Sequence, residues 1–382
     1  MNATEVTFLI LLGLIVHTYL LYPLILVIAS SAVKQEYKET YMESALPSVT
    51  MVVSAFNEQE IIQQKLENCL SLDYPPAKMT FSIGSDGSTD GTNEILLSVA
   101  KNGQIRSHIF HERKGKASVI NRLVEMSSSE IIVFSDANTL YDRNAIRLLV
   151  RHFEKSRVGV VSGRLIFTAE ASQTAERQYW AIESHIRYLE GKLGLPLGAN
   201  GAVYAIRRSL FVPFPENRPI ADDFILPLKI YGMGHTFVYD REARAFEQAN
   251  DLREEFRRRV RIGAQNFSGI SEIASFLNPF AGGIAFALWS HKIIRWMVPF
   301  LMIAVFILNY YLTTIHQMYL YSFWFQVLTY VTAFFTYVYR ENSWKFKVLW
   351  YPTYFVVMNL ALLMGFMNYI LGKQQSSWQA RR

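Results

Sequence analysis

Three short acidic motifs are the residues of this 382-residue chain best suited to chemistry. They contain Asp86, Asp136 with Asn138, and the adjacent pair Asp222 and Asp223. The first two motifs each follow an apolar, strand-like run, so their side chains are expected at the carboxyl ends of strands, where open α/β sheets bind ligands. Oxygen ligands in that position can hold a divalent cation together with a phosphate. The pattern predicts a metal-dependent enzyme that handles a nucleotide phosphate.

Each acidic motif also has a purely structural alternative. Asp86 lies in a Gly-, Ser- and Thr-rich segment, where it can bind a nucleobase or ribose or simply belong to a turn. Asp136 and Asn138 can ligate Mg²⁺ or Mn²⁺, the amide with less charge, or can cap a buried turn. Asp222 and Asp223 can favour a helix N-terminus, or one can act as a general base whose pKa its neighbour helps to raise. We adopt the functional interpretation of all three motifs and choose Asp223 as the base.

Two basic segments can oppose phosphate charge. Lys116 precedes an expected helix and can contact the phosphates of a donor, although a solvated basic loop is the alternative. Downstream lies the run Arg257, Arg258, Arg259 and Arg261. A helical pitch puts Arg257 and Arg261 on one face, with Arg258 beside them. Some of these arginines should contact membrane lipid, and one guanidinium is expected on a diphosphate.

Alternating strand and helix patterns would position these residues. Strands are predicted over residues 48–55, 80–83, 107–111 and 130–134, and helices over residues 58–72, 90–101, 117–126 and 175–193. Such alternation is typical of a mostly parallel, twisted sheet with helices on its faces. The region from residue 46 to 277 is long enough for one such α/β domain with a full core.

Apolar segments flank this central region. Residues 6–33 contain no Asp, Glu, Lys or Arg, and residues 296–315, 317–339 and 348–371 are three further uncharged runs. Each has about the 20 residues that a helix needs to cross a bilayer. We therefore expect a transmembrane helix at 1–33, the α/β domain at 46–277, an interfacial helix at 278–295, three transmembrane helices at 296–371 and a polar tail at 372–382. A fifth span over residues 274–290 is the alternative to the interfacial helix.

The positions of the basic residues predict on which side of the membrane the central domain lies. They also indicate which ligands the protein binds. Lys34 and Lys38 follow the first span, and Arg340, Lys345 and Lys347 lie between the last two. The positive-inside rule then makes the central domain cytoplasmic, in a multi-pass protein of the cell (plasma) membrane. The net charge is +6, but the basic residues concentrate beside the membrane and in the arginine run, which favours anionic lipid and a phosphorylated donor over nucleic acid. The lone cysteine excludes an intrachain disulfide.

Taken in order, these motifs resemble the integral-membrane family 2 glycosyltransferases, the group that contains cellulose, chitin, hyaluronan and poly-N-acetylglucosamine synthases. The resemblance covers nearly the whole chain. It is carried by the segment 53–58, Asp86 in Ser-Asp-Gly-Ser, Lys116 in Gly-Lys-Ala, Asp136-Ala-Asn138, Gly198-Ala-Asn-Gly201, Tyr204-Ala-Ile-Arg207-Arg208, Asp222-Asp223 and the arginine run.

The resemblance implies a GT-A (Rossmann-like) fold, an inverting single displacement and a nucleotide-sugar donor, with a UDP-sugar expected first. It also implies site residues. Catalysis would fall to Asp223, Asp222 and Arg261; donor binding to Ala55, Asn57, Glu58, Asp86, Lys116, Asp136 and Arg258; acceptor binding to Gly198, Ala199, Asn200 and Gly201; and metal binding to Asp136 and Asn138.

Three positions depart from the family pattern. Ser85 stands where the opening motif usually has its first Asp, and Asn138 replaces the second metal Asp. The Gln-any-any-Arg-Trp motif of processive synthases appears as residues 258–262, with Arg261 kept and Ile262 in place of Trp. Because that Trp contacts the acceptor end of a growing polymer, the change argues against processive synthesis.

The sequence therefore predicts an inverting, membrane-embedded hexosyl- or N-acetylhexosaminyl-type glycosyltransferase with a glycan or lipid-linked acceptor. Assembly as a homo-oligomer is compatible with this prediction. Within the family the alternative is a processive polysaccharide synthase. Outside it, the alternatives are a non-catalytic nucleotide-sugar-binding partner of a synthase and a nucleotidyltransferase.

Overall fold

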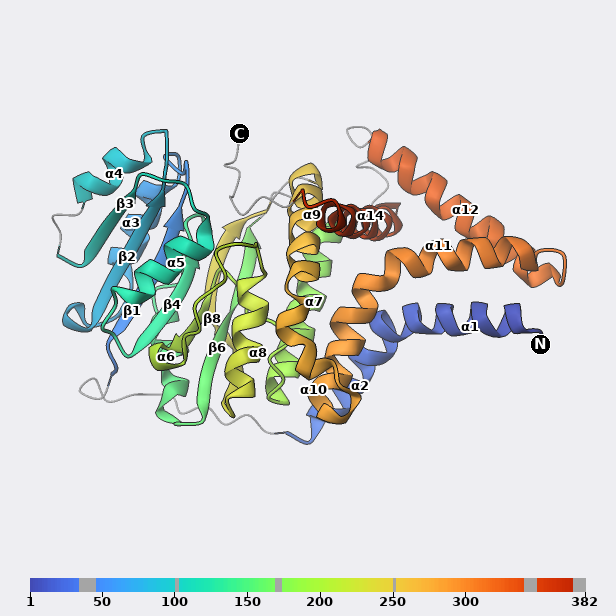
Figure 1. Ribbon diagram of the computed structural model, residues 1–382, viewed down its shortest axis with the longest axis horizontal. Helices are drawn as coiled ribbons and strands as arrows, with labels where there is room; N and C mark the ends of the chain where they lie inside the picture. The colour runs from blue at the N-terminus through green and yellow to red at the C-terminus, as the bar shows by residue number, and fades with distance from the viewer. Residues whose placement is uncertain (34–45, 100–102, 169–173, 250–251, 340–348, 374–382) are drawn as a thin grey trace.

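The computed structural model describes residues 1–33, 46–99, 103–168, 174–249, 252–339 and 349–373, and an eight-stranded mixed sheet forms its centre (Figure 1). The strands are β1 (Val49–Ala55), β2 (Met79–Asp86), β3 (Ile105–Phe110), β4 (Ile131–Asp136), β5 (Leu140–Tyr141), β6 (Val158–Thr168), β7 (Tyr204–Arg207) and β8 (Thr236–Gln248). The helices around the sheet are α3 (Ile62–Ser71), α4 (Thr92–Val99), α5 (Lys116–Glu125), α6 (Ala145–Val150), α7 (Thr174–Lys192), α8 (Asp222–Gly232) and α9 (Leu252–Ser268).

The strand order is β3-β2-β1-β4-β7-β6-β8-β5. β1 pairs in parallel with both β2 and β4, whereas β7 runs antiparallel between β4 and β6. The register sets Ser54 opposite Asp136 and Ala55 opposite Ser85. The carboxyl ends of β1, β2 and β4 therefore meet at one edge, as the sequence predicts, and carry the first two acidic motifs there.

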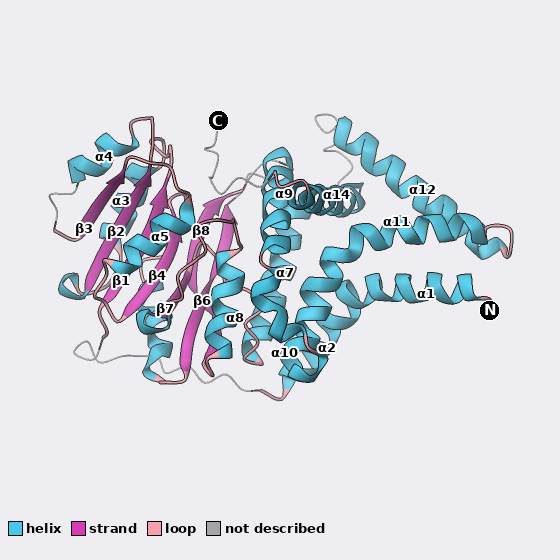
Figure 2. Cartoon of the chain, in the orientation of Figure 1, coloured by secondary structure: helices cyan, strands magenta, loops and turns pink. Residues whose placement is uncertain are grey.

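Helices cover both faces of the sheet (Figure 2). On one face α5, α7 and α8 bury apolar side chains such as Leu123, Ile186 and Leu228 against the strands. On the other face α3, α4 and α6 contribute residues such as Leu66 and Leu149. Burying one leucine in this way contributes roughly 1.5–3 kcal/mol, so the two layers hold the strand ends in fixed positions. The mixed α/β, GT-A-like architecture expected from the sequence is confirmed.

The remaining helices extend from the sheet domain. They are α1 (Ala3–Val16), α2 (Tyr22–Ser31), α10 (Gly283–Leu288), α11 (Ile294–Leu312), α12 (Gln317–Val338) and α14 (Trp350–Ile370). The π-helical turns His17–Leu21 and Trp289–Ile293 join α1 to α2 and α10 to α11. In Figure 1, α1 and α11 project together away from the sheet, whereas α2 and α10 lie beside the domain.

Three helices in the described part of the chain are long and apolar enough to cross a membrane: Ala3–Ser31, Gly283–Leu312 and Trp350–Ile370. The expected span at residues 317–339 forms the 22-residue helix α12 but is not in this set. The helix Gly283–Leu312 runs past residue 295 without a break, so no helix end marks the expected border between the interfacial and transmembrane segments.

Some expectations fall outside the described residues. Lys34 and Lys38, the basic loop from 340 to 347 and all but the first two residues of the tail lie there. The side of the membrane on which the sheet domain lies therefore stays a prediction from the sequence.

Candidate active site

A cavity of about 950 Å³ opens at the carboxyl ends of β1, β2 and β4 and extends under α9 to α14. Its wall brings together most of the residues singled out in the sequence: Glu58, Asp86, Lys116, Asp136, Asn138, Gly198, Ala199, Asn200, Gly201, Asp222, Asp223, Arg258 and Arg261. Ala55 and Asn57 are not part of this wall. Asn57 instead accepts a hydrogen bond from the Thr89 backbone N–H at 2.8 Å.

Lys116 and Asp136 form an ion pair at the centre of the cavity. The Lys116 Nζ lies 2.7 Å from Asp136 Oδ1 and 3.8 Å from Asp222 Oδ2. Burial alone would raise the pKa of Asp136, but Lys116 holds it below its ordinary value. Burial alone would lower the pKa of Lys116, but Asp136 and Asp222 hold it above its ordinary value. Both side chains are therefore charged at neutral pH.

Asp222 and Asp223 begin α8 and differ in their contacts. Burial, reinforced by Asp223 and Asp136, raises the pKa of Asp222 to about 6 against the opposing effect of Lys116. The Asp223 carboxylate accepts a hydrogen bond from the Gly201 backbone N–H at 3.2 Å, and the Asp223 carbonyl accepts one from the Ala199 N–H at 2.8 Å. Asp223 is thus attached to the 198–201 loop, which the resemblance associates with the acceptor.

The approach of that loop to Asp223 needs a glycine. A Cβ added to Gly201 would lie 3.2 Å from the Asp223 carboxylate oxygen and 3.3 Å from its Cβ. These contacts are tighter than ordinary van der Waals contact, so any larger residue at 201 would move the loop or the carboxylate.

Asp86 lines the cavity and holds the loop that precedes α5. Its carboxylate accepts hydrogen bonds from the backbone N–H groups of Lys114 and Gly115 at 2.8 and 2.9 Å, and its side chain is almost fully buried. These bonds fix the loop that leads into α5 and so the position of Lys116. Asp86 has this structural role in addition to the donor contact expected from the sequence.

Asn138 faces a glutamate that the sequence analysis missed. The Asn138 amide nitrogen donates to Glu247 Oε1 at 2.7 Å, and Arg258 NH1 lies 3.9 Å from the same oxygen. Glu247 lies near the end of β8, a strand that the sequence analysis did not predict. Because this strand was not predicted, no local sequence signal identified Glu247.

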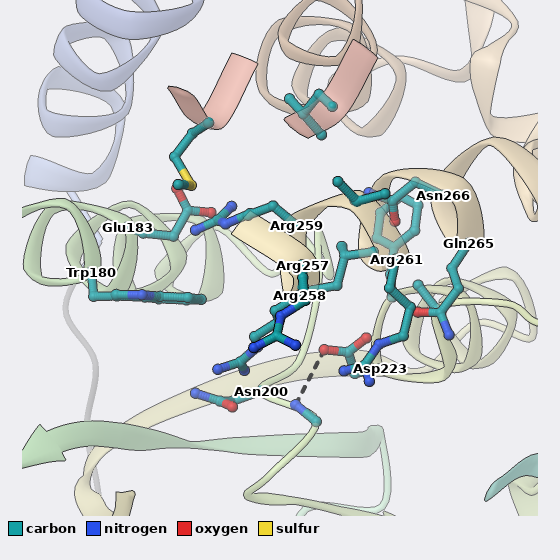
Figure 3. Close-up of a pocket in the computed structure, with 18 of the residues that line it drawn as sticks. Trp180, Glu183, Asn200, Asp223, Arg257, Arg258, Arg259, Arg261, Gln265 and Asn266 are labelled. Atoms are coloured by element: carbon teal, nitrogen blue, oxygen red, sulfur yellow. Dashed lines mark hydrogen bonds between the residues drawn. The ribbon is translucent and has the colours of Figure 1, made fainter. Parts of the chain in front are cut away.

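The arginines of α9 divide between two neighbourhoods (Figure 3). Arg259 pairs with Glu255 at 2.8 Å and lies over the rings of Tyr179 and Trp180, so it ties α9 to α7. Arg261 faces the acidic centre. Burial and the neighbouring Arg258 lower the pKa of Arg261 to about 10, opposed by the nearby carboxylates, so its guanidinium remains charged at neutral pH.

The donor atoms near Asp136 suit a hard divalent cation. Asp136 supplies a carboxylate and Asn138 an amide oxygen, the ligand type that Mg²⁺ and Mn²⁺ prefer. Among the described residues, no group of three or more His, Cys, Asp or Glu side chains is arranged to hold a metal. The Lys116 ammonium already contacts Asp136 Oδ1, so a metal on this carboxylate would compete with Lys116 for that oxygen.

A second polar cluster lies on the cavity wall beside the candidate membrane helix Gly283–Leu312. It consists of Glu183 and Arg187 of α7 with His291, Lys292 and Arg295 of the helix Gly283–Leu312. None of these residues was predicted from the sequence to belong to the site. The available signal was the charged pattern at 291, 292 and 295, which interrupts an otherwise apolar stretch with helical spacing.

About half of this chain is similar in sequence to known polysaccharide synthases. A poly-beta-1,6-N-acetyl-D-glucosamine synthase of Staphylococcus epidermidis is 25% identical over 222 residues, which is 56% of this chain and 52% of that protein. The synthase of the same name from Staphylococcus aureus is 25% identical over 203 residues, 51% of this chain and 48% of that protein. The chain spans about half the length of the curated relatives it matches.

Among solved structures, a mannosyltransferase from Pyrobaculum calidifontis in complex with GDP-Man and Mn²⁺ superposes with a TM-score of 0.70. The two chains are 19% identical, and the match covers 96% of this chain and 99% of that one. This likeness concerns the fold. The sequence model of glycosyl transferase family 2 matches residues 50–211, which include Asp86, Lys116 and Asp136. By this match, residues 50–211 belong to glycosyl transferase family 2.

Proposed function

We propose that the protein is a membrane-embedded, inverting glycosyltransferase that moves a sugar from a nucleotide-diphosphate donor to a lipid-linked or polysaccharide acceptor. The observation that carries this proposal is the single cavity in which the Lys116–Asp136 pair, Arg261 and the Asp223-bound acceptor loop meet. The Lys116–Asp136 pair and Arg261 can bind diphosphate, and Asp223 with the 198–201 loop can bind an acceptor hydroxyl in the same cavity.

In the proposed reaction, Asp223 accepts the proton of the acceptor hydroxyl. The acceptor oxygen forms a bond to the anomeric carbon while the bond from that carbon to the diphosphate oxygen breaks, and the nucleoside diphosphate leaves with the electron pair. A general base of this kind contributes roughly 10²–10⁴-fold to the rate. The carboxylate takes no covalent bond to the sugar, so one displacement inverts the anomeric configuration.

Cationic side chains neutralise the leaving group. Lys116 and Arg261 lie beside Asp136, where they can bind the diphosphate oxygens as charge develops. Asp136 and the Asn138 amide oxygen would hold Mg²⁺ or Mn²⁺, which supplies further positive charge when bound. We further propose that the donor is a UDP-sugar, that the sugar is a hexose or N-acetylhexosamine, and that the sheet domain is cytoplasmic at the plasma membrane.

The test is a donor panel. Purified full-length protein is incubated with UDP-, GDP- and dTDP-sugars, with and without Mn²⁺ or Mg²⁺, in the presence of lipid extracts or glycan acceptors. We expect release of nucleoside diphosphate and a glycosylated product visible by mass spectrometry. If no donor is consumed with any acceptor, the proposal is wrong, and release of pyrophosphate would indicate a nucleotidyltransferase instead.

A further inference from the structure

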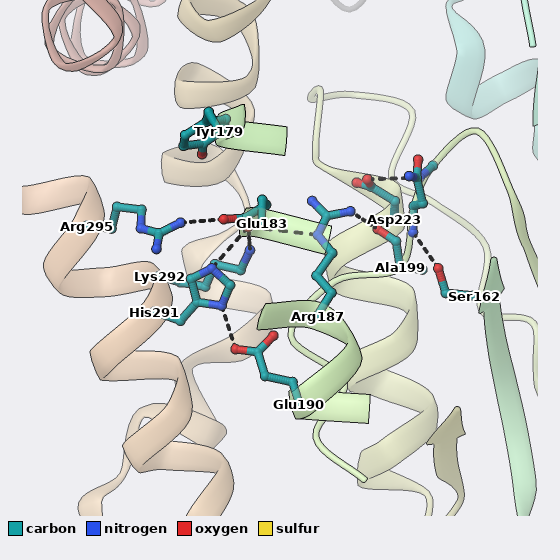
Figure 4. A network of polar contacts seen from close by, with 12 residues as sticks. Ser162, Tyr179, Glu183, Arg187, Glu190, Ala199, Asp223, His291, Lys292 and Arg295 are labelled. Atoms are coloured by element: carbon teal, nitrogen blue, oxygen red, sulfur yellow. Dashed lines mark hydrogen bonds and ion pairs between the residues drawn. The ribbon is translucent and has the colours of Figure 1, made fainter. Parts of the chain in front are cut away.

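A buried cationic cluster lies at the end of the cavity nearest to the membrane helices (Figure 4). Glu183 is at its centre, and its carboxylate lies 2.7 Å from Arg295 NH1 and 3.0 Å from His291 Nε2. The same carboxylate lies 3.8 Å from Arg187 Nε and 4.0 Å from Lys292 Nζ. The side chains of Arg187, Lys292 and Arg295 are each at most 15% exposed. Four nitrogen-bearing side chains therefore converge on one carboxylate.

The cluster has more positive than negative charge. The nearest second carboxylate, Glu190, is engaged by His291 Nδ1 at 2.6 Å and by the Tyr22 hydroxyl at 2.8 Å. Even with His291 counted as neutral, three cations face two carboxylates. Among the described residues, the Nε atoms of Arg187 and Arg295 have no hydrogen-bond partner. Buried cations are costly unless they are paired, so this arrangement suits an additional anion.

The cluster adjoins the acceptor loop. A Cβ built on Gly198 would lie 3.8 Å from Lys292 Nζ, and Arg187 NH1 lies 3.4 Å from the Ala199 carbonyl. Ala199 in turn donates its N–H to the Asp223 carbonyl. Figure 4 shows Arg187 between Glu183 and this loop. An anion bound by Lys292 and Arg187 would therefore lie on the acceptor side of the cavity, away from the Lys116–Asp136 pair.

The wall next to the cluster is apolar. Tyr354, Phe355, Met358 and Leu362 of α14 line the same cavity, and Tyr19 lies under the Arg295 guanidinium at 5.2 Å. Helix α14 is one of the three helices apolar enough to cross a membrane. Along the cavity wall, Asp223 is thus followed by the cationic cluster and then by an apolar surface. This surface continues along α14, a candidate membrane helix.

We propose that the Arg187–Lys292–Arg295 cluster binds the phosphate or diphosphate of a lipid-linked acceptor, with the lipid tail against α14. This inference rests on the proposed function. Of the two acceptor classes named there, it selects the lipid-linked acceptor. The planar guanidinium groups match phosphate oxygens in pairs, and the lysine acts as a point charge. A polysaccharide without phosphate would leave these cations unmatched, and free phosphate would leave the apolar wall unused.

The test measures lipid binding without any donor. Full-length protein in neutral detergent is titrated with a ten-carbon prenyl phosphate, the matching prenol and inorganic phosphate, and Kd is measured by thermophoresis. We expect the prenyl phosphate to bind at least about 10-fold more tightly than either control, because only it has both charge and tail. Equal binding of the prenol would overturn the anion site, and equal binding of inorganic phosphate would overturn the lipid assignment.

Variants locate the site. Lys292→Met and Arg187→Met should each weaken prenyl phosphate binding by about 10-fold or more, whereas Lys292→Arg should retain it. The matched control is Lys192→Met, because Lys192 also lies on α7 and bonds the Ser30 carbonyl at 2.8 Å but is outside the cavity wall. Melting temperatures within a few degrees of the wild-type value show that the variants fold. Unchanged binding by both methionine variants of the cluster would overturn the proposal.

The two proposals fail differently. If Lys292→Met transfers sugar to a lipid phosphate as fast as the wild type, the cation subsite is wrong and the glycosyltransferase function stands. If the wild type consumes no donor, the proposed function is wrong, whereas the lipid-binding result is obtained without donor and is judged separately.

Discussion

The Asn138 amide nitrogen lies 2.7 Å from Glu247 Oε1, although 109 residues separate the two in the chain. The amide can donate to the glutamate, but an aspartate at 138 could not. The amide of Asn138 thus suits its buried neighbour Glu247. This contact gives a structural reason for an asparagine at the position where the family usually has a second aspartate.

Replacing Asn138 with Asp should make stability depend on a divalent cation. Two carboxylates in contact repel each other unless a cation lies between them, so we expect Asn138→Asp to melt a few degrees lower without metal and to regain that loss in Mn²⁺. Differential scanning fluorimetry of the full chain measures this. Asn138→Ala loses the same hydrogen bond without adding charge, so its melting temperature should fall without Mn²⁺ rescue. An equal response of both variants to Mn²⁺ would contradict the interpretation.

Asp223→Asn should strongly reduce the rate of sugar transfer and leave the affinity for the donor nearly unchanged. The amide keeps the shape of the side chain and can still face the Gly201 loop, but it cannot accept the acceptor proton, so we expect a loss of roughly 10²–10⁴-fold in the transfer rate. Binding of the nucleotide sugar should change less than about threefold, since Asp223 lies on the acceptor side. Single-turnover kinetics and a separate donor titration distinguish these effects. Normal transfer by this variant would favour a non-catalytic partner of a synthase.

Arg261 and Arg259 offer a matched comparison on one helix. Arg261→Met should reduce the transfer rate by roughly 10²-fold or more, because its charge faces the diphosphate site. Arg259→Met should instead lower the melting temperature, because Arg259 bonds Glu255 and packs on Tyr179 and Trp180. Rates and melting curves of the two variants are compared in the same detergent. Equal effects of both substitutions on both measurements would show that the two arginines share one structural role.

Donor binding should weaken as the pH rises through the pKa of Asp222. That pKa is about 6, so Asp222 is largely neutral at pH 5 and largely ionised at pH 7. Ionisation adds a negative charge beside Lys116, and we expect the Kd of an intact nucleotide sugar to rise roughly three- to tenfold over this range. The diphosphate of the intact donor is a diester that does not titrate there. Asp222→Asn should flatten the profile, and an unchanged pH dependence in this variant would contradict the assignment.

Sequence patterns predicted the first half of the sheet well, because β1 to β4 alternate with helices and end at acidic turns. The strands β6, β7 and β8 were not predicted, since β8 mixes charged and apolar residues and β7 has only four residues. Local sequence patterns likewise identified only some of the site residues. Asp86, Lys116 and Asp136 sit on local motifs, whereas Glu247 and the Glu183 cluster reach the cavity only through tertiary packing.

The helix Gly283–Leu312, which is long and apolar enough to cross a membrane, carries His291, Lys292 and Arg295 of the cationic cluster in one continuous element. Arg295 lies about 26 Å before Leu312 along the helix axis, at 1.5 Å per residue, and Pro299 lies within the helix between them. If this helix spans the bilayer, the cluster lies at a set height relative to the hydrocarbon core. The enzyme would select acceptors by depth, because only a head group that stands at that height in the leaflet can reach Asp223.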